Sequence, residues 1–244
     1  MASGAAAVGL RLWRLLVRLT LFAALLWVVA VGTLLLERRS LIYPQVQDFD
    51  PSYAGGLPRG RVEIVEASDG IPLHVWVAPP LEGRPVILHF TGNGAYTPGA
   101  ALAVAPFVLR GYGAAILSYR GAGRAPGAPS EAAFTADAIA VYDALPRLLG
   151  VSAPPIIQGA SLGAALAVSL ASQRPAAAVV LEAPFDRLCA VAAHHYRWLP
   201  ACLIQWDERW DSIDRIASVE APLLVLAAAR DTLIPPTHAR RLFA

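Results

Sequence analysis

The sequence predicts an α/β domain, a mostly parallel sheet with helices on both faces, preceded by one membrane-spanning helix. Two observations predict this class. Short apolar runs alternate with helical patterns along most of the 244 residues, and residues 19–36 carry no charge at all. The composition agrees, because 56% of the residues are hydrophobic and 16% are charged. This is too apolar for a disordered or nucleic-acid-wrapping chain.

The first predicted element is the apolar segment near the amino terminus. Residues 19–36 read LTLFAALLWVVAVGTLLL, and a helix over about 15–36, within a segment 1–40, can cross a hydrocarbon core of about 30 Å. A cleaved signal peptide is the alternative, although the apolar run exceeds the usual length of a signal-peptide core. Arginines that precede the run favour an amino terminus inside the cell. We therefore expect a single-pass membrane protein whose remaining domain, 41–244, is extracytoplasmic.

Seven apolar runs predict strands in the rest of the chain. The first two alternate and look like an antiparallel edge, whereas most of the later runs are almost continuously apolar, as expected for parallel strands buried on both faces. The predicted strands are Val62–Ala67, Leu73–Ala78, Pro85–Phe90, Ala114–Tyr119, Pro155–Gln158, Ala177–Leu181 and Pro222–Ala227. Helical patterns between them include Pro98–Leu109, Ser130–Leu149 and Leu162–Ser172.

The stretch Gly159-Ala160-Ser161-Leu162-Gly163 carries the strongest chemical signal. It lies between a predicted strand and a helix of small residues, which is the context that a Gly-x-Ser-x-Gly nucleophile turn requires. The flanking glycines avoid collisions with the neighbouring strand and helix, and the helix amino terminus favours developing negative charge. The pattern predicts that Ser161 is a nucleophile; an ordinary tight turn is the alternative.

A nucleophilic serine needs amide donors for the oxyanion and a carboxylate that orients a base. The expected donors are the backbone N–H groups of Leu162 and of Asn93, which lies in a glycine-flanked turn after the third predicted strand. An ordinary strand-to-helix turn is the alternative there. The expected acid is Asp231, after the last predicted strand, with Glu182 and Asp186 as competing carboxylates.

On these motifs the chain from 41 onwards resembles the α/β-hydrolase superfamily, and within it the membrane-anchored serine hydrolases of the serine-aminopeptidase-like and α/β-hydrolase-domain group. The residues that carry the resemblance are Thr91-Gly92-Asn93-Gly94, Ser118 to Arg124, Gly159 to Gly163 and Asp231 to Pro235. Thr91 and Ser118 depart from the family pattern, which usually has His and Asp there. The resemblance implies the α/β-hydrolase fold and a cap over the pocket, expected at 186–215; ordinary helix packing is the alternative for that segment.

The resemblance also implies a catalytic histidine after Asp231, beyond one further helix and one further strand. His238 lies in what reads as the start of that helix, so we interpret it as a surface or site-rim residue and not as the base. We therefore expect that the sequence is truncated at its carboxyl end, without its last strand, its last helix and its base.

The predicted function is hydrolysis of an ester, thioester or amide through an acyl-enzyme on Ser161. The alternative is a catalytically silent fragment, or a membrane-tethered interaction protein without the histidine. The expected partners are a small or lipid-like acyl substrate and the lipid bilayer, with no nucleic acid; the oligomeric state stays open.

No cofactor or metal is expected. The sequence contains no lysine, which excludes Schiff-base chemistry, a phosphate-loop lysine and a Ser-Lys dyad. The two cysteines, Cys189 and Cys202, cannot form a four-thiolate zinc site, and they are either bridged or two buried thiols. The adjacent pair His194-His195 cannot face one way on a helix, which argues against a metal site there.

Overall fold

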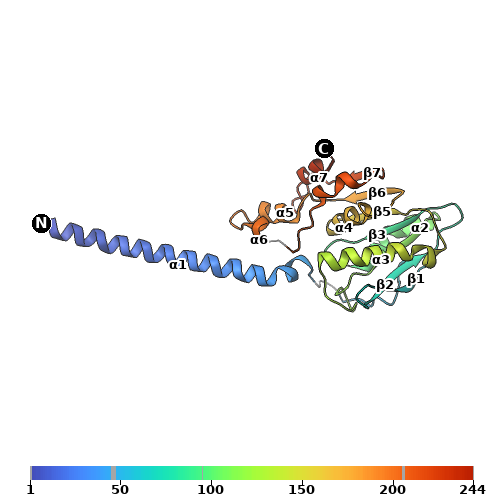
Figure 1. Cartoon of the computed structure of the whole chain (residues 1–244), viewed down its shortest axis with the longest axis horizontal. Helices are drawn as coiled ribbons and strands as arrows, with labels where there is room; N and C mark the ends of the chain where they lie inside the picture. The colour runs from blue at the N-terminus through green and yellow to red at the C-terminus, as the bar shows by residue number, and fades with distance from the viewer. Residues whose placement is uncertain (1, 45–47, 95, 205–206, 244) are drawn as a thin grey trace. The chain divides into compact units, whose positions relative to one another are not determined.

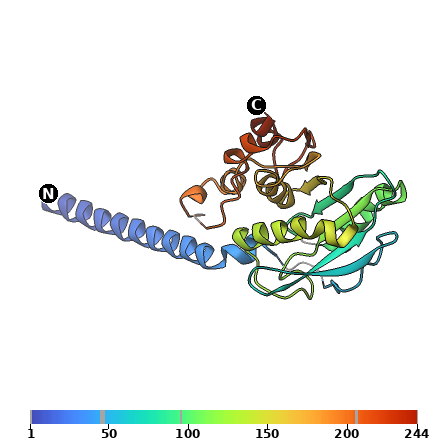
Figure 2. The same cartoon turned by 45° about the vertical axis from the view of Figure 1, so that its right-hand side comes forward.

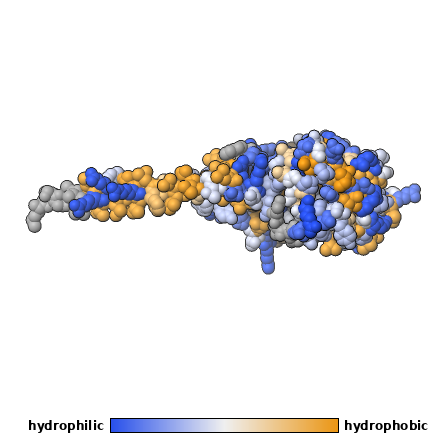
Figure 3. Space-filling view, turned by 90° about the horizontal axis from the view of Figure 1, so that it is seen from below, coloured by the Kyte–Doolittle hydropathy of each residue, from blue (hydrophilic) through white to orange (hydrophobic). Residues whose placement is uncertain are grey.

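The computed structural model describes residues 2–44, 48–94, 96–204 and 207–243 (Figure 1). The chain separates into two compact units, 1–41 and 42–244. The first unit is one helix, α1 (Ala2–Ile42), which is long and apolar enough to cross a membrane. The predicted span of 15–36 lies inside this helix, which continues on both sides of it. Figure 3 shows the apolar residues that cover much of its surface.

The second unit is built on a seven-stranded sheet with the order β1-β2-β4-β3-β5-β6-β7. The first two pairings, β1 with β2 and β2 with β4, are antiparallel, and the others are parallel. This confirms the predicted mostly parallel sheet with an antiparallel edge. The strands are β1 (Arg61–Glu66), β2 (Pro72–Ala78), β3 (Val86–Phe90), β4 (Gly113–Leu117), β5 (Ile156–Ala160), β6 (Ala178–Glu182) and β7 (Leu223–Leu226).

Helices cover both faces of the sheet (Figures 1 and 2). On one face α2 (Thr97–Leu109) packs against Trp76 and Ile116, and the larger core on the other face includes residues of α3 (Glu131–Leu149) and α4 (Leu162–Ala171). Alternate residues of a strand point to opposite faces, so β2 and β4 each supply both cores.

Local sequence signals set the ends of the longest helix of this unit. Ser130 caps the start of α3, because its hydroxyl accepts a hydrogen bond from the N–H of Ala133 at 3.1 Å. Gly150 ends the helix in the left-handed conformation, with φ of 67°, which glycine adopts without steric cost. The predicted helix Ser130–Leu149 therefore differs from α3 only by its capping residue.

The last part of the chain holds short elements. Helices α5 (Leu188–His195) and α6 (Ala201–Ile204) are joined by a disulfide between Cys189 and Cys202. The 3-10 turns η1 (Ser212–Asp214) and η2 (Ile216–Ser218) precede β7, and α7 (Thr237–Phe243) follows it. Of the two possibilities that the sequence leaves for the cysteines, the structure has the bridge.

The sheet also determines where a site can form. Strands β3, β5, β6 and β7 are parallel, so their carboxyl ends lie at one edge of the sheet. The loops that follow these strands contain Asn93, Ser161, Asp186 and Asp231. The four predicted or competing residues therefore share one edge.

Candidate active site

Ser161 lies at a sharp bend between β5 and α4. Its backbone has φ of 53° and ψ of −116°, a conformation that non-glycine residues rarely adopt. The neighbouring glycines make the bend possible. A Cβ atom at Gly159 would lie 2.0 Å from the carbonyl oxygen of Gly163, and a Cβ atom at Gly163 would lie 2.2 Å from the carbonyl oxygen of Phe90. Only glycine fits at both positions, as the sequence motif requires.

The surroundings of Ser161 fit a reacting hydroxyl. Its backbone N–H donates to the carbonyl oxygen of Glu182 at 2.8 Å, which fixes the bend against β6. The side chain is half-buried, and its hydroxyl has no hydrogen-bond partner among the described residues. Leu162 is the first residue of α4, so its N–H has no acceptor within the helix and lies at the positive end of the helix dipole.

The loop after β3 lies beside this bend. A Cβ atom at Gly92 would lie 3.6 Å from the Cβ of Ser161, so the backbone of the loop comes close to the serine. Asn93 follows and is exposed. The structure thus brings together the bend and the loop that were predicted to supply the two amide donors. The roles of Ser161, Leu162 and Asn93 stay predictions.

Sequence reasoning missed the residue that holds this loop. The hydroxyl of Tyr119, a buried residue after β4, donates a hydrogen bond to the carbonyl oxygen of Thr91 at 2.8 Å. The neighbouring Arg120 binds the buried carboxylate of Asp137 at 2.5 and 2.7 Å and the half-exposed carboxylate of Asp69 at 2.7 Å. The Ser-Tyr-Arg-Gly motif marked this turn, but only the fold shows its partners.

Asp231 forms the turn after β7. Its Oδ1 accepts hydrogen bonds from the N–H groups of Leu233 and Ile234, at 2.9 and 2.8 Å. These bonds fix the carboxylate, which is half-buried. Within residues 2–44, 48–94, 96–204 and 207–243, Oδ2 has no hydrogen-bond partner. This arrangement leaves one oxygen for an imidazole N–H.

Both competing carboxylates are occupied by other partners. Glu182 accepts a hydrogen bond from the side-chain amide of Gln158 at 2.6 Å. Asp186 is buried, with Oδ1 2.5 Å from Nδ1 of His238 and Oδ2 bound by Arg241. Burial alone raises the pKa of the Asp186 carboxyl, but the hydrogen bonds from Arg241 and His238 outweigh it, so this pKa lies below its usual value.

The interpretation of His238 as a surface or rim residue is wrong. The side chain is buried, with 3% of the residue exposed, because it pairs with Asp186 and ties α7 to the loop after β6. The sequence around His238 shows a helix start but contains no sign of a partner that lies 52 residues earlier.

The histidine pair contacts the turn of Asp231. One ring nitrogen of His195, Nε2, lies 2.8 Å from the carbonyl oxygen of Leu233. The rings of His194 and His195 meet edge to face with centroids 5.1 Å apart, so they do not point to one ion. Among the described residues no three His, Cys, Asp or Glu side chains are grouped to hold a metal.

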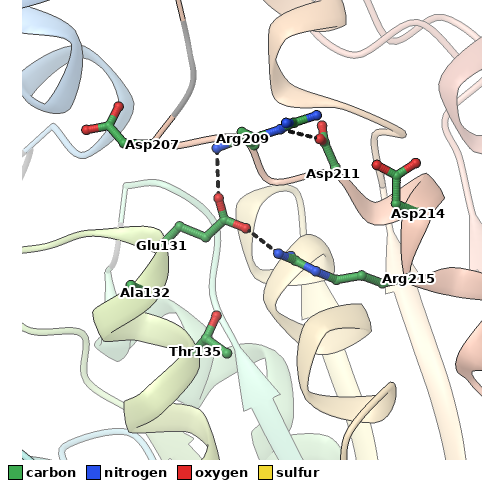
Figure 4. Close-up of a pocket in the computed structure, with 8 residues that line it drawn as sticks. All are labelled: Glu131, Ala132, Thr135, Asp207, Arg209, Asp211, Asp214 and Arg215. Carbon is green, nitrogen blue, oxygen red and sulfur yellow. Dashed lines mark hydrogen bonds and ion pairs between the residues drawn. The ribbon is translucent and has the colours of Figure 1, made fainter.

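A polar cavity of about 520 Å³ lies between the start of α3 and the segment before η1 (Figure 4). The carboxylate of Glu131 accepts hydrogen bonds there from the N–H groups of Arg209 and Trp210 and from the side chain of Arg215. The residues that line the cavity are Glu131, Ala132, Thr135, Asp207, Arg209, Asp211, Asp214 and Arg215. None of the predicted site residues lines it.

A second buried cluster adjoins this region and was not expected from the sequence. The hydroxyl of Tyr43 donates to the carboxylate of Glu208 and accepts from the indole N–H of Trp210 at 3.0 Å. The same carboxylate accepts the N–H of Glu131 at 2.8 Å. Burial and the Glu208 carboxylate raise the pKa of Tyr43, so its hydroxyl remains a donor.

Comparison with known proteins shows several relatives. An uncharacterized protein of Mycobacterium tuberculosis is 43% identical over 230 residues, which cover 91% of this chain and 80% of that protein. The α/β-hydrolase domain-containing protein WAV2 of Arabidopsis thaliana is 28% identical, over 89% and 78%. The lysophosphatidylserine lipase ABHD12 of Danio rerio is 31% identical over 66% of this chain, which spans 47% of that lipase.

Among solved structures, an esterase of Pyrococcus furiosus superposes with a TM-score of 0.61 and 18% identity. The superposition covers 82% of this chain and 81% of the esterase. At this identity the likeness shows the fold alone. No family model matches the sequence.

Proposed function

The chain belongs to the α/β-hydrolase superfamily, and on that premise we propose that it is a membrane-anchored serine hydrolase that cleaves an acyl bond. The observation that carries the proposal is the bend at Ser161. A half-buried hydroxyl in a rare backbone conformation at a helix start, beside a loop backbone, suits nucleophilic attack on a carbonyl.

In the proposed reaction the Oγ of Ser161 attacks the carbonyl carbon while its proton passes to a histidine base. The N–H groups of Leu162 and Asn93 bind the oxyanion, and one missing donor of this kind typically costs about 3 kcal/mol of transition-state stabilisation. The leaving group departs with the proton, and water then hydrolyses the acyl-serine. The proposal uses no metal or organic cofactor.

Asp231 is the proposed orienting acid, because its Oδ1 is fixed by two backbone N–H groups and its Oδ2 is open. None of the histidines hydrogen-bonds to Ser161 or to Asp231 among the described residues. The proposal therefore assigns the orienting role to Asp231 and assigns the base to none of these histidines.

The proposed substrate is lipid-like. Two observations support this class, the sequence similarity to a lysophosphatidylserine lipase and the helix α1, which is long and apolar enough to hold the enzyme at a membrane. The proposed cap over the pocket is the segment 186–215, which includes α5 and α6 and of which 205–206 lie outside the described residues.

We also propose that the domain is extracytoplasmic. The disulfide between Cys189 and Cys202 supports this side, since disulfides persist in oxidising compartments. Protease treatment of intact and of opened cells tests it: the domain should be cleaved in intact cells. Protection until the cells are opened would contradict the proposed side.

A fluorophosphonate probe tests the nucleophile. The protein in its native membrane should be labelled, the Ser161→Ala variant should not, and the Ser172→Ala variant, which changes a serine at the other end of α4, should label like the wild type. Labelling that persists in Ser161→Ala would show that another residue is the nucleophile. A wild-type protein that does not label would support the catalytically silent alternative.

A further inference from the structure

The helical hairpin formed by α5 and α6 exposes large apolar side chains. Tyr196 is 53% exposed, Trp198 52% and Leu203 80%. Exposed tryptophan and tyrosine are costly in contact with water alone, and side chains of this kind are enriched where proteins meet the headgroup region of a bilayer. We refer to these three residues, together with the exposed His194 and Arg197, as the hairpin surface.

The segment that contains the hairpin carries basic side chains but no acidic ones. From Arg187 to Trp206 the sequence contains no Asp or Glu, whereas it contains two arginines and two histidines. Arg197 is exposed between the two aromatic residues of the hairpin surface. A cationic side chain between aromatic ones suits a surface of phosphate-bearing lipid headgroups, because the long stem lies along apolar groups while the guanidinium reaches the phosphates.

The hairpin is held in one shape. The disulfide from Cys189, which is buried, to Cys202 joins α5 to α6 across 13 residues. His195 bonds to the carbonyl oxygen of Leu233, which ties the end of α5 to the turn of Asp231. A surface that is already ordered loses little conformational entropy when it binds.

The hairpin lies near Tyr43, the residue that directly follows α1 in the chain. Helix α1 ends at Ile42, and the next residue, Tyr43, hydrogen-bonds to Glu208 and Trp210. The hairpin ends at Ile204, four residues before Glu208, and four extended residues span at most about 14 Å. The end of the hairpin therefore lies close to the residue that follows the proposed membrane helix.

We propose that the hairpin surface docks into the headgroup region of the bilayer that α1 crosses. In this arrangement Tyr196 and Trp198 lie at the level of the headgroups, Leu203 reaches the acyl boundary and Arg197 pairs with lipid phosphates. The hairpin is tied to the turn of Asp231 by His195, so docking also brings the sheet edge that holds Ser161 toward the bilayer. This inference rests on the proposed membrane anchoring, but not on the catalytic roles.

Nitroxide labels on single added cysteines test the docking. The full chain is reconstituted in vesicles of phosphatidylcholine and phosphatidylglycerol, and collisions of each label with oxygen and with a water-soluble nickel chelate are measured. The labelled variants are Tyr196→Cys in the hairpin surface, Leu25→Cys in α1 and Leu81→Cys. Leu81 is the matched control, since it is 55% exposed but lies in the loop between β2 and β3, at the opposite edge of the sheet.

The expected result is that the labels at Tyr196 and Leu25 lose collisions with the nickel chelate and gain collisions with oxygen, while the label at Leu81 behaves as in water. If the Leu25 label is in lipid and the Tyr196 label is in water, docking of the hairpin is wrong and the anchoring stands. If both labels are in water, the anchoring and the docking are wrong.

A second copy of the chain is the competing occupant of the hairpin surface. It would show as distance-dependent broadening between Tyr196 labels on two chains in detergent, and this result would also overturn docking into lipid. The added cysteine is labelled under non-reducing conditions, so that the disulfide between Cys189 and Cys202 stays intact. One label per chain and an unchanged unfolding midpoint check that each variant is folded.

Discussion

The hydroxyl of Tyr119 donates a hydrogen bond to the backbone carbonyl oxygen of Thr91, 2.8 Å away. Thr91 begins the loop whose next residue, Gly92, lies against the side chain of Ser161. A buried side chain at the end of β4 thus holds the backbone that is proposed to bind the oxyanion. Its effect is on position, because Tyr119 itself has no part in the proposed proton transfers.

Removal of this hydroxyl should slow the reaction more than it weakens the fold. In Tyr119→Phe we expect labelling by a fluorophosphonate to fall about tenfold, with a loss of about 1 kcal/mol in the free energy of unfolding. Tyr142→Phe is the control, because it removes a comparable bond, 2.7 Å to the carbonyl oxygen of Pro175, from a partly buried tyrosine that is far from Thr91 in the sequence. Equal labelling rates in the two variants would contradict a positioning role.

The bend at Ser161 should not tolerate a methyl group at Gly163. A Cβ atom there would overlap the carbonyl oxygens of Phe90 and Thr91, at 2.2 and 2.4 Å, and backbone atoms cannot move aside cheaply. We expect Gly163→Ala to lose about 3 kcal/mol in the free energy of unfolding, measured by denaturant titration. Gly94→Ala has open space around the new atom and should change by less than about 0.5 kcal/mol. A stable Gly163→Ala protein would refute the close packing of α4 on β3.

The ion pair of Arg120 and Asp137 should be sensitive to loss of one partner. The side chain of Asp137 is fully buried and that of Arg120 is 5% exposed, so Asp137→Asn removes the buried counter-charge of a buried guanidinium at a cost of about 3 kcal/mol. The matched change Asp69→Asn removes the other carboxylate bound by Arg120. The side chain of Asp69 is 52% exposed, so this change should lower the unfolding midpoint much less than Asp137→Asn does. Similar unfolding midpoints for both variants would contradict this difference.

Stability should fall in mild acid because of His89, which is buried in β3. Burial lowers the pKa of His89 below its ordinary value of about 6.5, although a hydrogen bond to the side chain of Gln158 and the charge of Glu182 act in the opposite direction. Between the lowered pKa and the ordinary one the unfolded chain binds a proton that the folded chain does not. The contribution of the neutral His89 to the free energy of unfolding is therefore complete above about pH 6.5, and it is lost as the pH falls below this value.

Chemical denaturation at several pH values measures this effect. In His89→Leu the decline of the unfolding free energy below about pH 6.5 should become shallower. His194→Gln changes an exposed histidine and should keep the wild-type slope. If the unfolding free energy of His89→Leu falls with pH as steeply as that of the wild type, His89 is not the source of the acid sensitivity.

The fold could be predicted from the sequence because its signals are local. Strands buried on both faces need continuous apolar runs, and the Gly-x-Ser-x-Gly turn needs glycines at fixed positions around Ser161. The partners within the site could not be predicted, since they come from distant segments. Asp186 meets His238 only because the loop after β6 and α7 lie together in the fold, and no local pattern near either residue indicates the pairing.

The bond from Tyr43 to Glu208 joins residues that are 165 positions apart. During translation the first of them leaves the ribosome long before the second, by about 8 to 33 seconds at ordinary elongation rates. In the nascent chain the hydroxyl of Tyr43 therefore remains without this acceptor until Glu208 has been synthesised. Tyr43 can bond to Glu208 only after β1 to β6 have been synthesised. This buried contact therefore forms late in the synthesis of the chain.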